Sequence, residues 1–167
     1  MSARPQDFHD APVTVAAWSG PRNISTAMMR AWENRGDCAV SDEPLYAAYL
    51  AETGLDHPGR DDVIAAGECD WRKVVRDLVG AVPEGKPIWY QKHMCHHLLP
   101  GMDRDWIMDL TNVLLIRDPA EVVASYLRTR GTVSSTACSN SGRSRTRRSS
   151  RSWIATQTSP QPLQRRG

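Results

Sequence analysis

The sequence lacks any long hydrophobic run. Its longest apolar stretches, such as residues 113–116, are far shorter than the roughly 20 residues that a membrane-spanning helix needs. The first residues, MSARPQDFHDAP, contain no apolar segment of the kind that directs secretion. We therefore expect a cytoplasmic protein that does not engage a membrane.

Closely spaced cysteine pairs are also absent. The four cysteines lie far apart, at positions 38, 69, 95 and 138, with no CxxC motif. This spacing argues against a disulfide-stapled secreted domain and predicts reduced thiols. Residues 93–97 hold three histidines and one cysteine, but no second ligand pair follows at zinc-site spacing. We therefore expect no metal.

Acidic residues are missing from the end of the chain. Residues 131–167 contain seven arginines and no Lys, Asp or Glu. Residues 1–130 therefore hold the other fourteen basic residues and all 19 acidic residues, which gives them a net charge of −5. The segment has few large apolar residues and no hydrophobic period, which predicts disorder. Nucleic-acid binding, an inert tail and out-of-frame translation all remain open, and the abrupt start of the Arg/Ser-rich composition favours the last.

The chain as a whole has the composition of a globular protein, with 40% hydrophobic and 24% charged residues. We expect a flexible N-terminus over residues 1–11 and a folded domain over residues 12–130. Hydrophobic patterns predict short strands at 13–18, 39–40, 88–90 and 112–116, helices at 24–35, 45–52, 71–79 and 119–129, and a loop at 53–67. Strands that alternate with helices indicate an α/β fold around a mainly parallel sheet.

The first candidate site is the loop between the strand at 13–18 and the helix that follows. It brings the hydroxyl groups of Ser25 and Thr26 and the guanidinium group of Arg22 to a helix N-terminus, where unpaired amides and the helix dipole favour phosphate or sulfate. The loop is not a Walker A motif, because GxxxxGK[ST] is absent. Alternatively, Ser25 and Thr26 only cap the helix.

A second candidate site follows the strand at 112–116. Arg117 ends this strand, and Ser125 lies about two helical turns further on, so both side chains can converge on one phosphate. Alternatively, Arg117 pairs with Asp118, and Ser125 lies on a solvated helix face. Because ligands bind α/β folds at the carboxyl ends of parallel strands, the two loops are expected to serve one ligand.

Both loops resemble motifs of the sulfotransferases. Residues 21–26 (PRNIST) resemble the loop that binds the 5′-phosphosulfate, and Arg117, Asp118 and Pro119 with Ser125 resemble the 3′-phosphate motif. The similarity covers residues 12–130 and is strongest to bacterial sulfotransferase-like proteins with a WSGPRNIST loop, some of them called aminotransferase-like. It implies a P-loop-type α/β domain that binds 3′-phosphoadenosine 5′-phosphosulfate and transfers its sulfuryl group to a hydroxyl or amine of a small acceptor.

The resemblance also implies roles for individual residues. The 5′-phosphosulfate would contact Arg22, Asn23, Ser25 and Thr26, and the 3′-phosphate would contact Arg117 and Ser125. Ile24 departs from the family, in which many members have Gly at that position. Lys92 and His93 resemble a Lys-x-His catalytic region with one residue missing, so His93 is the candidate base, and Glu43 is its rival. A surface histidine and a solvated loop acid are the alternative interpretations.

In the family, a further segment follows the Arg-to-Ser motif, whereas here the Arg/Ser-rich residues 131–167 take its place. We therefore expect a domain that is truncated or frameshifted at its C-terminus, marginally stable, and weak or inactive. A small P-loop kinase is one alternative function, although the Walker lysine is missing. Nucleic-acid binding through the basic tail is another, but the expected partner is a small-molecule acceptor. The oligomeric state is left open.

Overall fold

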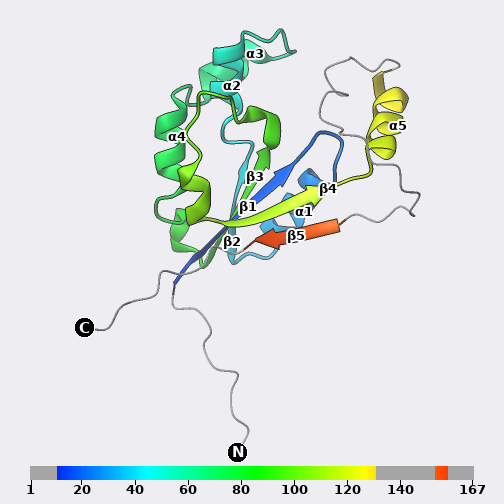
Figure 1. The fold of residues 1–167 in the computed structure, drawn as a ribbon. Coiled ribbons are helices and arrows are strands. Elements are labelled where there is room, and N and C mark those ends of the chain that lie inside the picture. The colour runs from blue at the N-terminus through cyan, green and yellow to red at the C-terminus, as the bar shows by residue number, and fades with distance from the viewer. Residues whose placement is uncertain (1–10, 131–152, 158–167) are drawn as a thin grey trace, which may run out of the picture.

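The computed structural model describes residues 11–130 and 153–157, and its centre is a five-stranded sheet (Figure 1). The strand order is β2-β3-β1-β4-β5, in which the first four strands run parallel and β5 runs antiparallel to β4. The strands are β1 (Val13–Ser19), β2 (Cys38–Asp42), β3 (Ile88–Met94), β4 (Thr111–Ile116) and β5 (Trp153–Gln157). The predicted α/β class with a mainly parallel sheet is confirmed.

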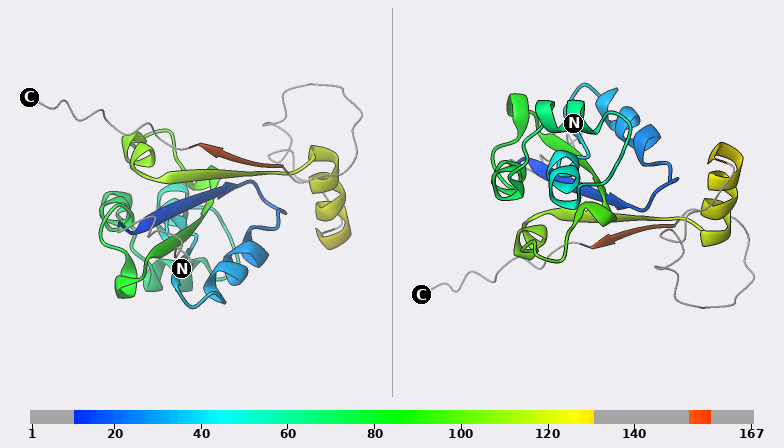
Figure 2. Two further views of the ribbon diagram at one scale, coloured as in Figure 1. Left: turned by 90° about the horizontal axis from the view of Figure 1, so that it is seen from below. Right: turned by 90° about the horizontal axis from the view of Figure 1, so that it is seen from above.

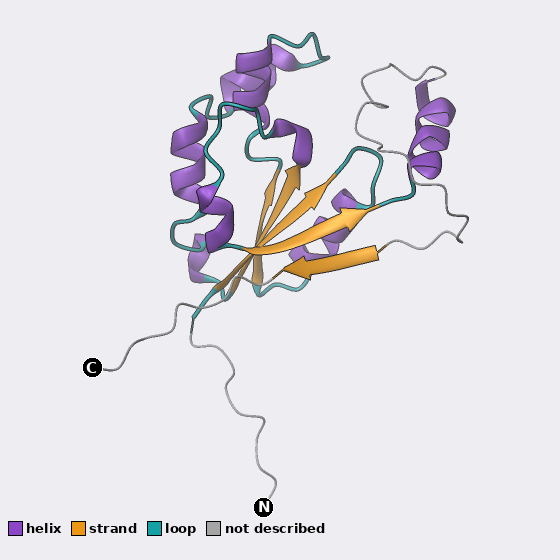
Figure 3. Ribbon diagram, in the orientation of Figure 1, coloured by secondary structure: helices purple, strands orange, loops and turns teal. Residues whose placement is uncertain are grey.

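Helices flank the sheet and follow its strands (Figure 3). The α-helices are α1 (Ser25–Glu33), α2 (Tyr46–Thr53), α3 (Arg60–Ala66), α4 (Trp71–Leu78) and α5 (Pro119–Arg130). Three short 3₁₀ helices are η1 (Pro83–Gly85), η2 (Cys95–His97) and η3 (Asp105–Asp109). Figures 1 and 2 show α5 beyond the carboxyl end of β4, set apart from the other helices.

The core lies on both faces of the central strand β1. Successive side chains of a strand point to opposite faces. Ala16 and Trp18 therefore pack with α4 and η3, whereas Val15 and Ala17 pack with Met29 of α1. Because both faces are covered, the strand has a continuous apolar sequence instead of an alternating one.

Three elements differ from the sequence prediction. The loop predicted at 53–67 was wrong in part, because Gly54 ends α2 and Gly59 precedes α3, a helix with no buried residue and hence no hydrophobic period. Strand β3 continues to Met94, four residues further than predicted. In the Arg/Ser-rich segment, β5 is a strand that the sequence did not indicate. The remainder of that segment, and residues 1–10, lie outside the described residues.

The polar end of β3 is buried in the core. His93 is only 1% exposed, its ring stacks on Trp18 with 4.3 Å between centroids, and its Nε2 lies 3.1 Å from Gln91 Oε1. Gln91 in turn donates to the carbonyl of Leu78 at 2.8 Å. Burial lowers the pKa of His93 to about 3, so the ring is neutral at physiological pH.

This burial makes stability depend on pH. The pKa of His93 is about 3 in the folded chain and 6.5 ordinarily, so its contribution is present above pH 6.5 and is lost as pH falls toward 3. When the pH falls from 7.5 to 5.5, the free energy of unfolding should decrease in both proteins. We expect the decrease to be about 1 kcal/mol smaller for His93→Phe than for the natural chain. Urea unfolding at both pH values measures this, and equal losses in the two proteins would contradict it.

Candidate functional site

A cleft of about 530 Å³ opens at the carboxyl ends of the four parallel strands. Its lining comes from segments that follow each strand: the loop between β1 and α1, Glu43 and α2 after β2, the end of β3 with η2, and Arg117 with α5 after β4. The two loops singled out in the sequence therefore border the same cleft, as predicted from their positions after parallel strands.

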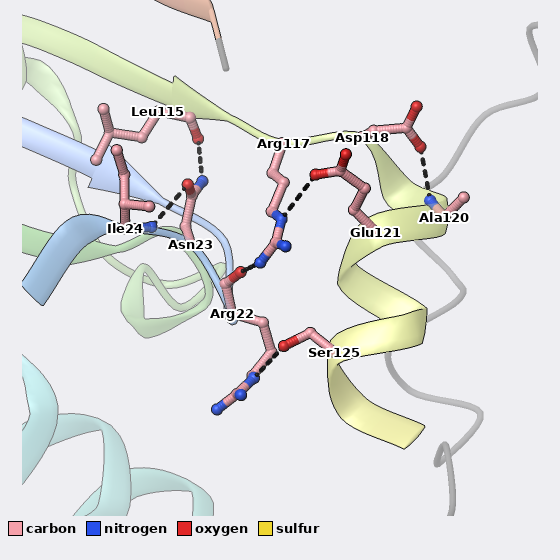
Figure 4. Close-up of polar contacts among 9 residues, drawn as sticks. All are labelled: Arg22, Asn23, Ile24, Leu115, Arg117, Asp118, Ala120, Glu121 and Ser125. Atoms are coloured by element: carbon pink, nitrogen blue, oxygen red, sulfur yellow. Dashed lines mark hydrogen bonds and ion pairs between the residues drawn. The ribbon is translucent and has the colours of Figure 1, made fainter. Parts of the chain in front are cut away.

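The loop after β1 is bound to the end of β4 (Figure 4). The carbonyl of Arg22 accepts a hydrogen bond of 2.5 Å from Arg117 Nη1, and Asn23 Nδ2 donates to the carbonyl of Leu115 at 2.9 Å. Arg22 has φ 59°, in the left-handed region that few residues other than glycine adopt. These bonds hold the loop in that conformation.

The start of α1 has no side-chain cap. Ser25 and Thr26 are the first two helical residues, and Ile24 occupies the cap position without a side-chain hydrogen bond to the helix. The alternative in which Ser25 and Thr26 only cap the helix is therefore not what the structure shows. Ile24 has φ −84°, which any residue can adopt, so the loop needs no glycine at this position for its backbone conformation.

Arg117 takes part in two contacts. Besides its bond to the carbonyl of Arg22, its Nε donates to Glu121 Oε2 at 3.2 Å. Asp118 instead caps α5 by accepting from the amide of Ala120 at 2.8 Å. The alternative pairing of Arg117 with Asp118 is therefore not observed.

The two motifs contact each other through Arg22. Its Nε donates to Ser125 Oγ at 3.0 Å, and its Nη2 donates to Thr129 Oγ1 at 3.0 Å. Ser125 is 7% exposed, so it does not lie on a solvated face. Thr129 was missed in the sequence, although its position four residues after Ser125 places both hydroxyl groups on one helix face.

A charged cluster lies further along the sheet, on the side of Arg22 that faces away from α5. Lys92 Nζ donates to Glu43 Oε1 at 2.6 Å and to Asp42 Oδ1 at 2.7 Å. The lysine side chain is only 5% exposed. Burial alone would lower the pKa of Lys92, but the bonds to the two carboxylates outweigh it and the net shift is upward, so Lys92 stays charged. Glu43, with φ 48°, lines the cleft.

His93, the candidate base, does not line the cleft. Lys92 and His93 are consecutive in β3 and therefore point to opposite faces: Lys92 lines the cleft and His93 enters the core. Its position does not support a role as base. The alternative of a surface histidine is wrong, because the ring is buried against Trp18. Of the two rival bases, only Glu43 is at the cleft.

Aromatic rings form the wall of the cleft next to α2. His97 stacks on Tyr46 with 5.0 Å between ring centroids and packs against Tyr49 at 4.8 Å. His96 meets Tyr49 edge to face at 5.5 Å, and Tyr46 Oη lies 3.0 Å from His57 Nδ1. This wall was not predicted from the sequence, in which His96 and His97 were candidates only for metal binding, because ring stacking between α2 and η2 leaves no sequence motif.

Within residues 11–130 and 153–157, no group of three or more His, Cys, Asp or Glu side chains is arranged to hold a metal ion. No helix in that part of the chain is long and apolar enough to cross a bilayer.

Comparison with known proteins gives two relatives, both from Arabidopsis thaliana. Branched-chain-amino-acid aminotransferase-like protein 2 is 38% identical over 112 residues, and protein 1 of the same name is 36% identical over 115 residues. The alignments cover 67% and 69% of this chain but 20% of each relative, so the chain matches about a fifth of their length. No solved structure gives a significant match.

A comparison with protein families matches residues 13–145 to the family described as "Sulfotransferase domain". This match includes both cleft loops, Glu43 and Lys92, and it runs past residue 130, the predicted end of the domain. It covers most of the chain, and the chain therefore belongs to the sulfotransferase domain family.

Proposed function

We propose that the chain binds 3′-phosphoadenosine 5′-phosphosulfate in the cleft and transfers its sulfuryl group to a hydroxyl or amine of a small acceptor. The observation that supports this most strongly is the meeting of two cationic loops, where Arg117 donates to the carbonyl of Arg22 beside the uncapped start of α1. The donor carries anionic groups at its 5′ and 3′ positions, so it requires two such loops in one cleft.

The donor would be held by charge and by backbone dipoles. The 5′-phosphosulfate fits the N-terminus of α1, where Ser25 and Thr26 line the cleft beside Arg22. The 3′-phosphate would bind Arg117 and Ser125, both of which also line the cleft. Asn23 would act by positioning, because its side chain bonds the carbonyl of Leu115 and the amide of Ile24.

In the proposed reaction, the oxygen or nitrogen of the acceptor attacks the sulfur atom. The bond between sulfur and the bridging phosphate oxygen breaks, and its electron pair leaves with adenosine 3′,5′-bisphosphate. The acceptor proton passes to the carboxylate of Glu43. The positive charges of Arg22 and Lys92 stabilise the negative charge that develops on the transferred group and the leaving oxygen.

The donor site can be tested by substitution of its arginines. Because bonds from an ionised donor contribute about 1.5–3 kcal/mol, we expect Arg22→Ala and Arg117→Ala each to weaken binding of adenosine 3′,5′-bisphosphate about 10- to 100-fold. Isothermal titration calorimetry measures this. Arg35→Ala is the control, because Arg35 forms an exposed ion pair with Asp37 and does not line the cleft. No heat with the natural chain would overturn the proposal.

The base can be tested by a matched pair of amide substitutions. Glu43→Gln and Asp42→Asn each remove one carboxylate charge from Lys92, but only Glu43 lines the cleft. We expect Glu43→Gln to bind adenosine 3′,5′-bisphosphate normally and to lose about 10²- to 10⁴-fold in sulfuryl transfer, whereas Asp42→Asn keeps most of it. Transfer of the labelled sulfuryl group from 3′-phosphoadenosine 5′-phosphosulfate to an added alcohol measures the rate. Equal losses in both variants would show that Glu43 acts only through Lys92.

A further inference from the structure

The cleft has two chemically different ends. Along the sheet order β2-β3-β1-β4, the arginines belong to the segments after β1 and β4, whereas Tyr46 and Tyr49 belong to α2, after β2. Figure 1 shows α2 and α5 at opposite sides of the sheet edge. The donor site therefore occupies the arginine end and leaves the aromatic end open to a second reactant.

The aromatic end is preformed. His97 is only 2% exposed and packs against Tyr46 and Tyr49. Its Nδ1 is buried and has no hydrogen-bond partner among the described residues. Buried polar atoms are nearly always paired, and an unpaired one lowers the stability of the fold. An unpaired imidazole nitrogen beside a cleft therefore indicates that the ring serves ligand binding and not stability.

The aromatic end also carries little charge. Burial lowers the pKa of His96, and it lowers that of His97 to about 3, so both rings are neutral at physiological pH. The carboxylate of Glu43 beside them disfavours an anion. Tyr46 Oη already contacts His57, and Glu43 is bonded to Lys92, so few polar groups are left to recognise the many hydroxyls of a sugar.

Building on the proposed function, we propose that Tyr46, Tyr49 and His97 form the acceptor subsite and that it takes an uncharged aromatic alcohol of the phenol class. The acceptor ring stacks on the tyrosine wall, and its hydroxyl points toward Glu43. Tyr49 is the residue that determines specificity, and His97 is a positioning residue that holds both tyrosines. The acceptor oxygen bonds to sulfur and its proton goes to Glu43, as in the general reaction.

The subsite can be tested without the donor. Fluorine NMR of 4-fluorophenol added to the full chain is expected to show saturable binding. Loss of an aromatic stack costs about 0.5–1.5 kcal/mol plus buried area, so Tyr49→Ala should weaken it about tenfold, whereas Tyr49→Phe retains it. Tyr126→Ala is the matched control, because Tyr126 lines the same cleft from α5. With the donor present, Tyr49→Ala should raise KM for 4-fluorophenol more than it lowers kcat.

Four results would overturn the inference. The first is the absence of saturable 4-fluorophenol binding, and the second is binding by Tyr49→Ala that is as tight as binding by the natural chain and by Tyr49→Phe. The third is a loss of affinity in Tyr126→Ala as large as that in Tyr49→Ala. The fourth is tighter binding of glucose or 4-fluorobenzoate than of 4-fluorophenol. Calorimetry with adenosine 3′,5′-bisphosphate separates the two proposals. If the bisphosphate binds and the phenol does not, the acceptor assignment fails alone. If the phenol binds and the bisphosphate does not, the proposed function fails, and the acceptor role fails with it.

Discussion

The hydrogen bond from Arg117 to the carbonyl of Arg22 is the contact on which the site depends. It joins a loop after β1 to a loop after β4, two neighbouring parallel strands that end at the same edge of the sheet. Together with the bonds from Arg22 to Ser125 and Thr129, it fixes how two segments far apart in sequence lie relative to each other. The bond from Asn23 to the carbonyl of Leu115 reinforces the same junction.

Backbone strain accompanies this arrangement. Arg22 and Glu43 both adopt left-handed φ angles, at a cost of about 1 kcal/mol or more each, and both line the cleft. Glu43 is held by its own backbone, because its amide donates to the carbonyl of Lys92 and its carbonyl accepts from the amide of Tyr46. Strain alone does not identify the site, since Glu84 has a similar φ in the η1 turn, outside the cleft.

The sequence allowed prediction of the four parallel strands and of both cleft loops, because apolar strands followed by capped or hydroxyl-rich helix starts are local patterns. It could not place His93. Neighbouring residues of β3 point alternately to the cleft and to the core, and the predicted strand ended before Lys92 and His93. Buried polar residues such as Gln91 and His93 are satisfied by partners far away in sequence or by each other, and no hydrophobic pattern reveals such pairs. Helix α3 was missed because none of its residues is fully buried, so its sequence has no clear hydrophobic period.

The spatial order of the functional groups differs from their order in the chain. The sheet order β2-β3-β1-β4 places Glu43, Lys92, Arg22 and Arg117 in succession along one edge, whereas the chain has Arg22 first. The crossover that inserts β3 between β2 and β1 therefore puts a charged lysine between Glu43, the proposed base, and Arg22, the first of the arginines proposed to bind the donor. A carboxylate directly beside Arg22 would pair with it and compete with an anionic donor. Lys92 instead pairs with Glu43 from within the sheet and separates its carboxylate from Arg22, in keeping with the anionic donor proposed for the arginine end and the uncharged ring proposed for the tyrosine end.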